Sequence, residues 1–154
     1  MLERVFLKIR EIIHYILHIN IYFGKGIILR GVPRLLYSKN INFGRGVRLN
    51  DKVFLHAANG IVLGNNVTLS YGAALITESY NTHDFKAYLQ RKHFGSSIVV
   101  GDNVWICANA IVLQGVTIAR NVIVGAGAVV TKNLCVENAI YAGNPARLIK
   151  RLEK

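Results

Sequence analysis

The clearest feature of the sequence is an apolar residue that recurs at every sixth position. From Val100 onward the first residue of each group of six is aliphatic or small. These lead residues are Val100, Ile106, Val112, Ile118, Val124, Val130, Val136 and Ala142. A second apolar series follows each lead residue by four positions, at Val104, Ala110, Val116, Val122, Ala128, Leu134 and Ile140. Each hexad therefore carries two positions that we expect to face a core.

A period of six matches neither a helix, which repeats every 3.6 residues, nor a half-buried strand, which repeats every 2. We interpret each hexad as one short strand and one corner of a coil, with three hexads to each turn. An earlier block keeps the same period, slips by two residues near Asn59 and Gly60, and then resumes. Its lead residues are Phe43, Leu49, Leu55, Leu63, Leu69 and Leu75. The pattern predicts a parallel β-helix over residues 41–142, with one widened corner at the slip.

Glycine or asparagine often follows the lead residue, as in Phe43-Gly44, Leu63-Gly64 and Val100-Gly101. We expect these positions to adopt positive φ at tight corners.

The segments outside the coil have different patterns. Residues 1–22 read as a helix whose apolar side faces the first coil as a cap, within a capping segment 1–40. This apolar side comprises Val5, Ile9, Ile12, Ile13, Ile16 and Leu17. Residues 143–154 read as a short basic helix with Pro145 near its start. Between these segments the period disappears over residues 77–97, which predicts a loop that protrudes from the coil.

Composition limits the classes of protein that remain. The 154 residues are 52% hydrophobic and 18% charged, which is typical of one folded domain. The most apolar stretch, 12–23, is interrupted by His14, His18 and Asn20, so we expect no spanning helix. Charges mixed into the first residues disfavour a cleaved secretory signal. Cys107 and Cys135 have no CxxC spacing, which fits a reducing cytoplasm.

The net charge is +11, and residues 1–48 carry nine bases and two acids. This asymmetry is compatible with nucleic acid, an anionic membrane surface or a phosphorylated molecule as partner. No nucleic-acid-binding module accompanies the charge, so nucleic acid is the least supported of the three.

Several strings resemble one known family. They are Val100-Gly101-Asp102-Asn103-Val104-Trp105-Ile106, Gly125-Ala126-Gly127-Ala128-Val129-Val130-Thr131-Lys132 and Ala142-Gly143-Asn144-Pro145-Ala146. They resemble the hexapeptide-repeat acyltransferases, nearest to the maltose, galactoside and polysaccharide O-acetyltransferase branch, over residues 41–150. The resemblance implies an all-β fold with a left-handed parallel β-helix, a homotrimer, acetyl-CoA as donor and a sugar hydroxyl of a surface polysaccharide, lipopolysaccharide or related glycoconjugate as acceptor.

The protruding loop contains the candidate catalytic residue. An alcohol attacks a thioester only when a base removes its proton, and a histidine that titrates near neutrality suits this role. His83 stands where the resemblance places the catalytic histidine, which implies direct transfer without an acyl-enzyme. It is followed by Asp84 rather than the proline usual in enzymes with simple sugar acceptors. Asn50 and Asp84 are the candidate acceptor-binding residues, although Asn50 also reads as a positive-φ corner residue.

The resemblance also implies where the donor binds, along the outside of the coils between two subunits. The matching positions are Ala108, Ala126, Thr131, Lys132, Arg147 and Lys150. Cations beside nucleotide phosphates make charge-assisted contacts, so Arg147 and Lys150 also make physical sense on one face of a terminal helix. Solvated surface charge is the simpler alternative reading for both.

Other readings stay open. His56, His83 and His93 invite comparison with the γ-type carbonic anhydrases, β-helix enzymes that bind zinc with three histidines, but the spacing differs and we expect no metal. His14 and His18 stand one helical turn apart, which a metal or an ordinary amphipathic helix explains. A non-catalytic scaffold whose basic N-terminal helix lies on an anionic membrane also fits, and such a peripheral membrane contact is compatible with catalysis as well. N-acetylation of an amino sugar is a further alternative. Cys107 lies in a regular hexad without an adjacent histidine, which favours a structural role.

Overall fold

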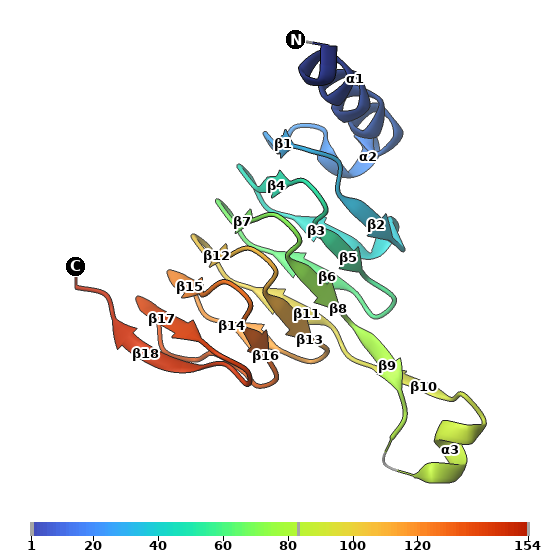
Figure 1. The fold of residues 1–154 in the computed structure, drawn as a ribbon, viewed down its shortest axis with the longest axis vertical. Coiled ribbons are helices and arrows are strands. Elements are labelled where there is room, and N and C mark those ends of the chain that lie inside the picture. The colour runs from blue at the N-terminus through green and yellow to red at the C-terminus, as the bar shows by residue number, and fades with distance from the viewer. Residues whose placement is uncertain (1, 83, 154) are drawn as a thin grey trace.

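The computed structural model describes residues 2–82 and 84–153. Its centre is a β-solenoid of about six turns, built from three parallel sheets that form the sides of one coil (Figure 1). The first sheet contains β1 (Ile28–Arg30), β4 (Arg48–Asn50), β7 (Thr68–Leu69), β12 (Trp105–Ile106), β15 (Val122–Val124), β17 (Ala139–Ala142) and β18 (Arg147–Arg151). The second contains β2 (Arg34–Leu36), β5 (Phe54–His56), β8 (Ala74–Ile76), β13 (Ile111–Leu113) and β16 (Val129–Val130). The third contains β3 (Ile41–Phe43), β6 (Ile61–Leu63), β11 (Ile98–Val100) and β14 (Thr117–Ile118).

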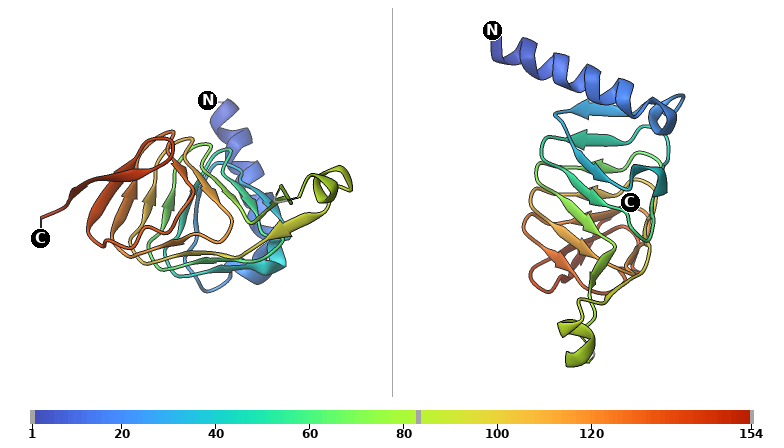
Figure 2. Two further views of the ribbon diagram at one scale, coloured as in Figure 1. Left: turned by 90° about the horizontal axis from the view of Figure 1, so that it is seen from below. Right: turned by 90° about the vertical axis from the view of Figure 1, so that its right-hand side faces the viewer.

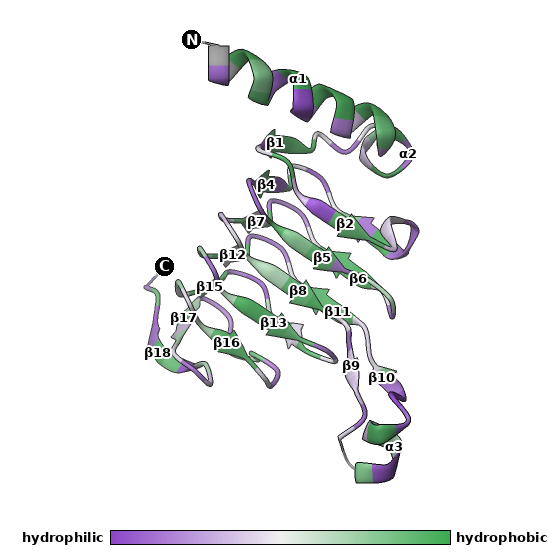
Figure 3. Cartoon of the chain, turned by 45° about the vertical axis from the view of Figure 1, so that its right-hand side comes forward, coloured by the Kyte–Doolittle hydropathy of each residue, from purple (hydrophilic) through white to green (hydrophobic). Residues whose placement is uncertain are grey.

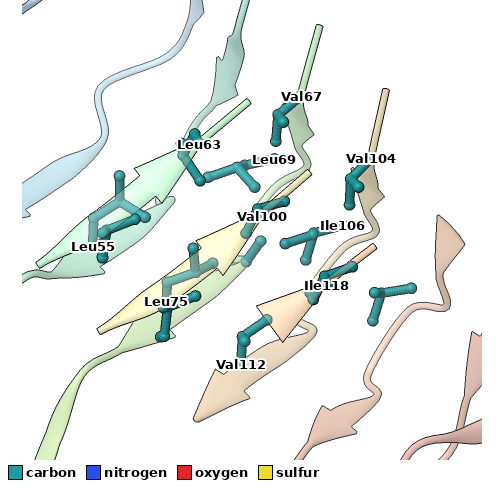
Figure 4. Packing of buried hydrophobic residues seen from close by; sticks show 14 of the residues in the cluster. Leu55, Leu63, Val67, Leu69, Leu75, Val100, Val104, Ile106, Val112 and Ile118 are labelled. Carbon is teal, nitrogen blue, oxygen red and sulfur yellow. The ribbon is translucent and has the colours of Figure 1, made fainter. Parts of the chain in front are cut away.

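The strand register confirms the hexad pattern. Each lead residue pairs with lead residues of the coils above and below, so that the lead residues form three columns inside the solenoid. One column runs Phe43, Leu63, Val100 and Ile118, and another runs Leu55, Leu75, Val112 and Val130. These side chains are at most 2% exposed and fill the interior (Figure 4). Burial of apolar area at ~25 cal/mol per Å² is the main stabilising contribution of such a core.

The period fails in the last coil. Val136, Ile140 and Ala142 were expected to face inward, but they are only half-buried, and Ala139 and Tyr141 fill the core instead. Tyr141 pairs with Val124, so this coil is one residue shorter than the others. Because strand side chains alternate between two faces, a shift of one residue reverses every position.

The predicted positive φ after the lead residues is wrong at most of these positions. Gly44, Gly64 and Gly101 have ordinary φ, and the positive φ occurs two residues later, at Gly46, Asn66 and Asn103. The glycines are required for another reason, because the coils approach closely there. A Cβ on Gly64 would lie 2.7 Å from the Gly101 carbonyl carbon.

Asparagines form a ladder along one edge of the solenoid. Asn66, Asn103, Asn121 and Asn138 all have positive φ, and each side chain bonds the next at 3.0 to 3.3 Å. Asparagine tolerates this backbone conformation better than most residues. The ladder therefore fixes the same corner in successive coils.

The C-terminal segment is a strand, and the predicted helix over 143–154 is wrong. β18 runs antiparallel to β17 on the outer edge of the first sheet. Without it, β17 would present unpaired backbone N–H and C=O groups at the end of the solenoid, and pairing satisfies them. Hydrogen bonding to the open edge of β17 thus stabilises residues 147–151 as a strand more than their local sequence stabilises a helix.

The N-terminal helix is confirmed, but its orientation is not the expected one. α1 (Leu2–Leu17) and α2 (Ile19–Tyr22) lie across the N-terminal end of the solenoid (Figure 2). Tyr22 is fully buried and meets the Phe43 ring edge-on. The predicted apolar face of α1 is 46% to 72% exposed, and Glu11 and His14 face inward instead. The coil itself begins at β1, inside the segment 1–40 that the sequence assigned to capping. None of the helices in the described ranges is long and apolar enough to cross a lipid bilayer.

Candidate functional site

The predicted loop leaves the solenoid between β8 and β11 and projects outward (Figure 1). Its stem is an antiparallel pair, β9 (Glu78–Tyr80) with β10 (His93–Gly95), and its tip carries α3 (Phe85–Leu89). Asp84 begins α3, because its Oδ1 accepts a hydrogen bond of 2.9 Å from the Lys86 backbone N–H. Such a cap stabilises a short helix by ~1 kcal/mol.

His83, the predicted catalytic base, lies outside the described residues, and its role stays a prediction. The described chain on either side of it belongs to the protruding loop.

The base of the loop is anchored at the slip in the hexad period. The Thr77 side chain is fully buried and donates a hydrogen bond of 2.8 Å to the His56 carbonyl oxygen. Asn59 bonds Thr77 through both its backbone N–H and its side-chain amide, each at 3.0 Å. A Cβ on Gly95 would collide with this Asn59 amide. The widened corner at Asn59 therefore holds the stem of the loop.

A cavity of about 290 Å³ opens on the outer face of the second sheet, beside the stem. Its lining combines aromatic rings with groups that can hydrogen-bond: Phe54, His56, Ile76, Glu78, Ser79, Tyr80 and His93. Sites for small ligands commonly combine apolar walls with a few polar groups in this way. Sequence reasoning singled out His56 and His93 only as possible zinc ligands and missed the cavity, because its lining residues come from distant positions.

The polar groups of the cavity are held by contacts around them. His93 Nδ1 lies 3.4 Å from Glu78 Oε2, and the Tyr80 ring packs edge-on against His93 with centroids 4.7 Å apart. The Tyr37 ring packs edge-on against His56 in the same manner. His56 Nδ1 is buried, and the described residues offer it no hydrogen-bond partner. A buried nitrogen of this kind gains from a ligand that supplies a hydroxyl group.

The candidate donor and acceptor residues divide between two corners of the solenoid. Asn50 is the last residue of β4, and Ala108 and Ala126 come two residues after β12 and β15, all in the first sheet. Gly127 N–H donates a hydrogen bond of 2.9 Å to the Ala108 carbonyl, so the coils of β12 and β15 stack directly. Thr131 and Lys132 follow β16 of the second sheet, at the corner from which the loop departs two strands away. The alternative prediction, that Asn50 is a corner residue with positive φ, is wrong, because the positive φ of this corner is at Lys52.

Arg147 and Lys150 are exposed on β18 and share one face despite the absence of a helix. A bulge in the pairing sets Arg147 opposite Ala142 and Lys150 opposite Ile140. Ala142 and Ile140 are two residues apart in β17 and lie on the same side of it. In Figure 2 this strand and the loop lie on opposite sides of the molecule.

Two further residues have structural roles. Cys107 is half-buried, and this burial raises the pKa of its thiol, which keeps it protonated and a poor nucleophile near neutral pH. The Trp105 Nε1–H donates a hydrogen bond of 2.8 Å to Ser70 Oγ and ties neighbouring coils together. Among the described residues, no three His, Cys, Asp or Glu side chains gather in an arrangement that could hold a metal ion.

Comparison with known proteins agrees with this architecture. The family model described as bacterial transferase hexapeptide (six repeats) matches residues 97–132. The crystal structure of a maltose O-acetyltransferase from Clostridium difficile 630 is 34% identical, with a TM-score of 0.78 over 83% of this chain and 67% of that one. The chain belongs to the hexapeptide-repeat acetyltransferases.

Two other proteins are also similar to this chain. A hexapeptide-repeat acetyltransferase from Vibrio cholerae, solved in complex with acetyl coenzyme A, is 25% identical, with a TM-score of 0.81 over 94% of this chain and 79% of that one. Protein CapG from Staphylococcus aureus is 43% identical over 98 residues, 60% of this chain and 54% of CapG. The chain spans a little over half the length of several curated relatives.

Proposed function

We propose that the protein is an acetyl-CoA-dependent O-acetyltransferase that acts on a sugar hydroxyl of a surface polysaccharide, lipopolysaccharide or related glycoconjugate. The observation that carries this proposal is the cavity beside the His83 loop, where aromatic rings and hydrogen-bonding groups converge. The V. cholerae relative, which was solved with acetyl coenzyme A, supports the donor. The maltose O-acetyltransferase relative supports a saccharide acceptor.

In this proposal the cavity takes one sugar ring of the acceptor. Phe54 and Tyr80 supply apolar surface for the C–H face of a pyranose, and the Glu78 carboxylate accepts hydrogen bonds from its hydroxyl groups. The cavity is open to solvent on the outside of the sheet, so the remainder of a longer glycan can extend away from the protein. This arrangement favours a polymeric or conjugated acceptor over a closed pocket for a free monosaccharide.

His83 acts as the general base. Its imidazole removes the proton from the acceptor hydroxyl while the hydroxyl oxygen attacks the thioester carbonyl carbon, and backbone N–H groups stabilise the oxyanion. The C–S bond then breaks, and the imidazolium returns its proton to the leaving thiolate. Asp84 caps α3 next to His83, so its contribution is to position this segment as well as to contact the acceptor.

The donor lies against the stacked corners at Ala108 and Ala126, where small side chains leave the backbone accessible. Arg147 and Lys150 on their shared face meet the nucleotide phosphates, and Thr131 and Lys132 line the path between. Within one chain, Ala108, Ala126, Arg147 and Lys150 lie away from the His83 loop, so a homotrimer in which the loop reaches a neighbouring subunit would bring them together. We place the protein in the cytoplasm, where acetyl-CoA is available and its two free cysteines stay reduced.

Release of coenzyme A thiol from acetyl-CoA, measured over a panel of oligosaccharides and polysaccharides, tests the proposal. We expect His83→Ala to lower kcat by ~10²–10⁴-fold, and His18→Ala, a matched control in the N-terminal helical region, to leave it unchanged. Double replacement of Arg147 and Lys150 by Ala should raise KM for acetyl-CoA about tenfold at low salt.

An unchanged rate in His83→Ala would remove this residue from the mechanism. Transfer to amino sugars alone would point to N-acetylation. Stoichiometric zinc, together with activity that needs no acetyl-CoA and is lost with a chelator, would favour the γ-carbonic anhydrase reading instead. Absence of acyl transfer to every acceptor would favour a non-catalytic scaffold.

A further inference from the structure

The first helix turns its apolar side to solvent. Ile12, Ile13 and Ile16 are 57%, 52% and 60% exposed, and Leu17 is 72% exposed. The apolar band, as we call this surface, comprises the exposed residues Val5, Phe6, Ile9, Ile12, Ile13, Ile16 and Leu17 of α1 together with Ile19 and Phe23 just after it. Figure 3 shows both strongly hydrophobic and hydrophilic segments around α1. Isolated apolar residues are normal on a protein surface, but a continuous band of this length marks a binding surface.

The orientation of α1 is fixed by polar contacts on its inner side. His14 is 8% exposed, and its Nε2 lies 3.0 Å from the Tyr22 hydroxyl, which itself belongs to the core. The Glu11 side chain, 6% exposed, accepts a hydrogen bond of 2.7 Å from Lys8 Nζ. Rotation of α1 to bury the apolar band against the coil would break the His14–Tyr22 contact and expose Glu11, whereas the Lys8–Glu11 pair lies within α1 and would rotate with it. The helix is therefore held with its apolar side outward.

The positive charge near the apolar band favours an anionic partner. Residues 12–50 contain six bases and no acid, and five of these bases are exposed on the first coils: Arg30, Arg34, Lys39, Arg45 and Arg48. An anionic bilayer surface attracts Lys and Arg side chains that lie close to it. A second copy packed end to end would set two such basic ends against each other. A copy packed along the sides of the coil would leave this end uncovered, because α1 lies across it (Figure 2).

We propose that α1 lies in the headgroup region of an anionic lipid bilayer, with the apolar band in the acyl boundary and the exposed bases of the first coils against the phosphates. Amphipathic helices of this kind rest in the plane of the membrane surface. This position agrees with the finding that none of the described helices can cross a bilayer. Docking at this end leaves the tip of the loop, which projects from the solenoid far from α1, open to an acceptor (Figure 1). The inference does not depend on the proposed transferase activity.

Vesicle flotation of the full chain tests the proposal. The probes are vesicles of phosphatidylcholine alone and of phosphatidylcholine with about 30% phosphatidylglycerol, a probe composition on the order of that in anionic membranes. We expect the protein to float with the anionic vesicles at low salt, and its partition coefficient to fall at least about fivefold in high salt. The double variant Ile12→Glu/Ile16→Glu should partition at least about tenfold less, since both apolar contacts are lost.

The control is Ile149→Glu, which makes one of these Ile→Glu replacements at an equally exposed isoleucine at the opposite end of the solenoid. It should float like the wild type, and circular dichroism should show that all variants keep their fold. No flotation of the wild type with anionic vesicles, or equal flotation of wild type and double variant, would overturn the proposal. A third outcome would also overturn the proposal: the wild type does not float, and the double variant has fewer subunits than the wild type. In that case a second copy of the chain, and not a membrane, packs against the apolar band. Thiol release with a water-soluble acceptor is measured separately, so failure of docking is distinguishable from failure of catalysis.

Discussion

At the residue scale, the glycines and asparagines of the corners have separate tasks. Gly64 and Gly101 keep ordinary φ and are needed because neighbouring coils leave no space for a Cβ. Asn66 and Asn103 instead take positive φ and bond each other along the ladder. The sequence shows which residues stand near the corners, but φ and the distance between coils are properties of the folded chain. The two roles therefore could not be separated by composition.

These two roles predict losses of stability of different size for two glycine substitutions. Gly64→Ala should lower the free energy of unfolding by ~1–3 kcal/mol, because the new Cβ meets the backbone of the next coil. Gly127→Asn should cost much less, since Gly127 has positive φ and open space where a Cβ would lie, and asparagine adopts this conformation in the ladder. Urea unfolding curves of both variants check the difference, and equal losses would contradict it.

At the element scale, α1 shows how tertiary contacts set the orientation of an amphipathic helix. Its apolar period predicts a helix correctly but also predicts an inward apolar face, and the structure has the reverse. The buried His14 contact with Tyr22 decides the orientation. The C-terminal segment behaves in the same way, because the open edge of β17 recruits residues 147–151 as a strand. The local sequence pattern carries no information about an unpaired sheet edge that another strand of the fold provides.

The buried imidazole predicts a pH dependence of stability. Burial, with a smaller effect from His18, lowers the pKa of His14 from 6.5 to about 4. The unfolded chain therefore binds more protons between these pH values, and stability falls as pH decreases from about 6.5 to 4. Glu11, Tyr15, His18 and Tyr22 are the other titratable groups near this inner side of the helix. Thermal unfolding at about pH 7.5 and about pH 5 should show a smaller loss in His14→Gln than in wild type. An equal loss in the two proteins would assign the effect to other groups.

At the scale of the whole molecule, the solenoid keeps the proposed acceptor site apart from most of the proposed donor-binding residues, although the reaction requires them to be close together. The loop and the cavity lie beside the second sheet, whereas Ala108, Ala126 and the basic pair on β18 lie on other faces. A straight solenoid does not bend back on itself, so residues on its separate faces cannot meet within one chain. Association of chains with their coils side by side is the arrangement that supplies a second wall.

Complementation between a variant without the catalytic base and a variant with weakened donor binding tests this arrangement. Three chains of 17.1 kDa give a trimer of about 51 kDa, which light scattering would detect. A His83→Ala chain coexpressed with an Arg147→Ala/Lys150→Ala chain should recover part of the wild-type activity at limiting acetyl-CoA, because some junctions then combine an intact loop with an intact donor surface. Recovery no greater than the sum of the two separately expressed variants would place the complete site within one chain.

By itself, the sequence determined the coil, its columns of lead residues, the place of the loop and the family. These features depend on which residue types repeat at which spacing, and a repeat transmits its geometry from coil to coil. The tertiary structure alone decided the shortened last coil, the edge strand β18, the outward face of α1 and the cavity beside the stem. Each of these depends on contacts between residues far apart in the chain, where the demand for backbone pairing or the fit of a buried side chain outweighs the local pattern.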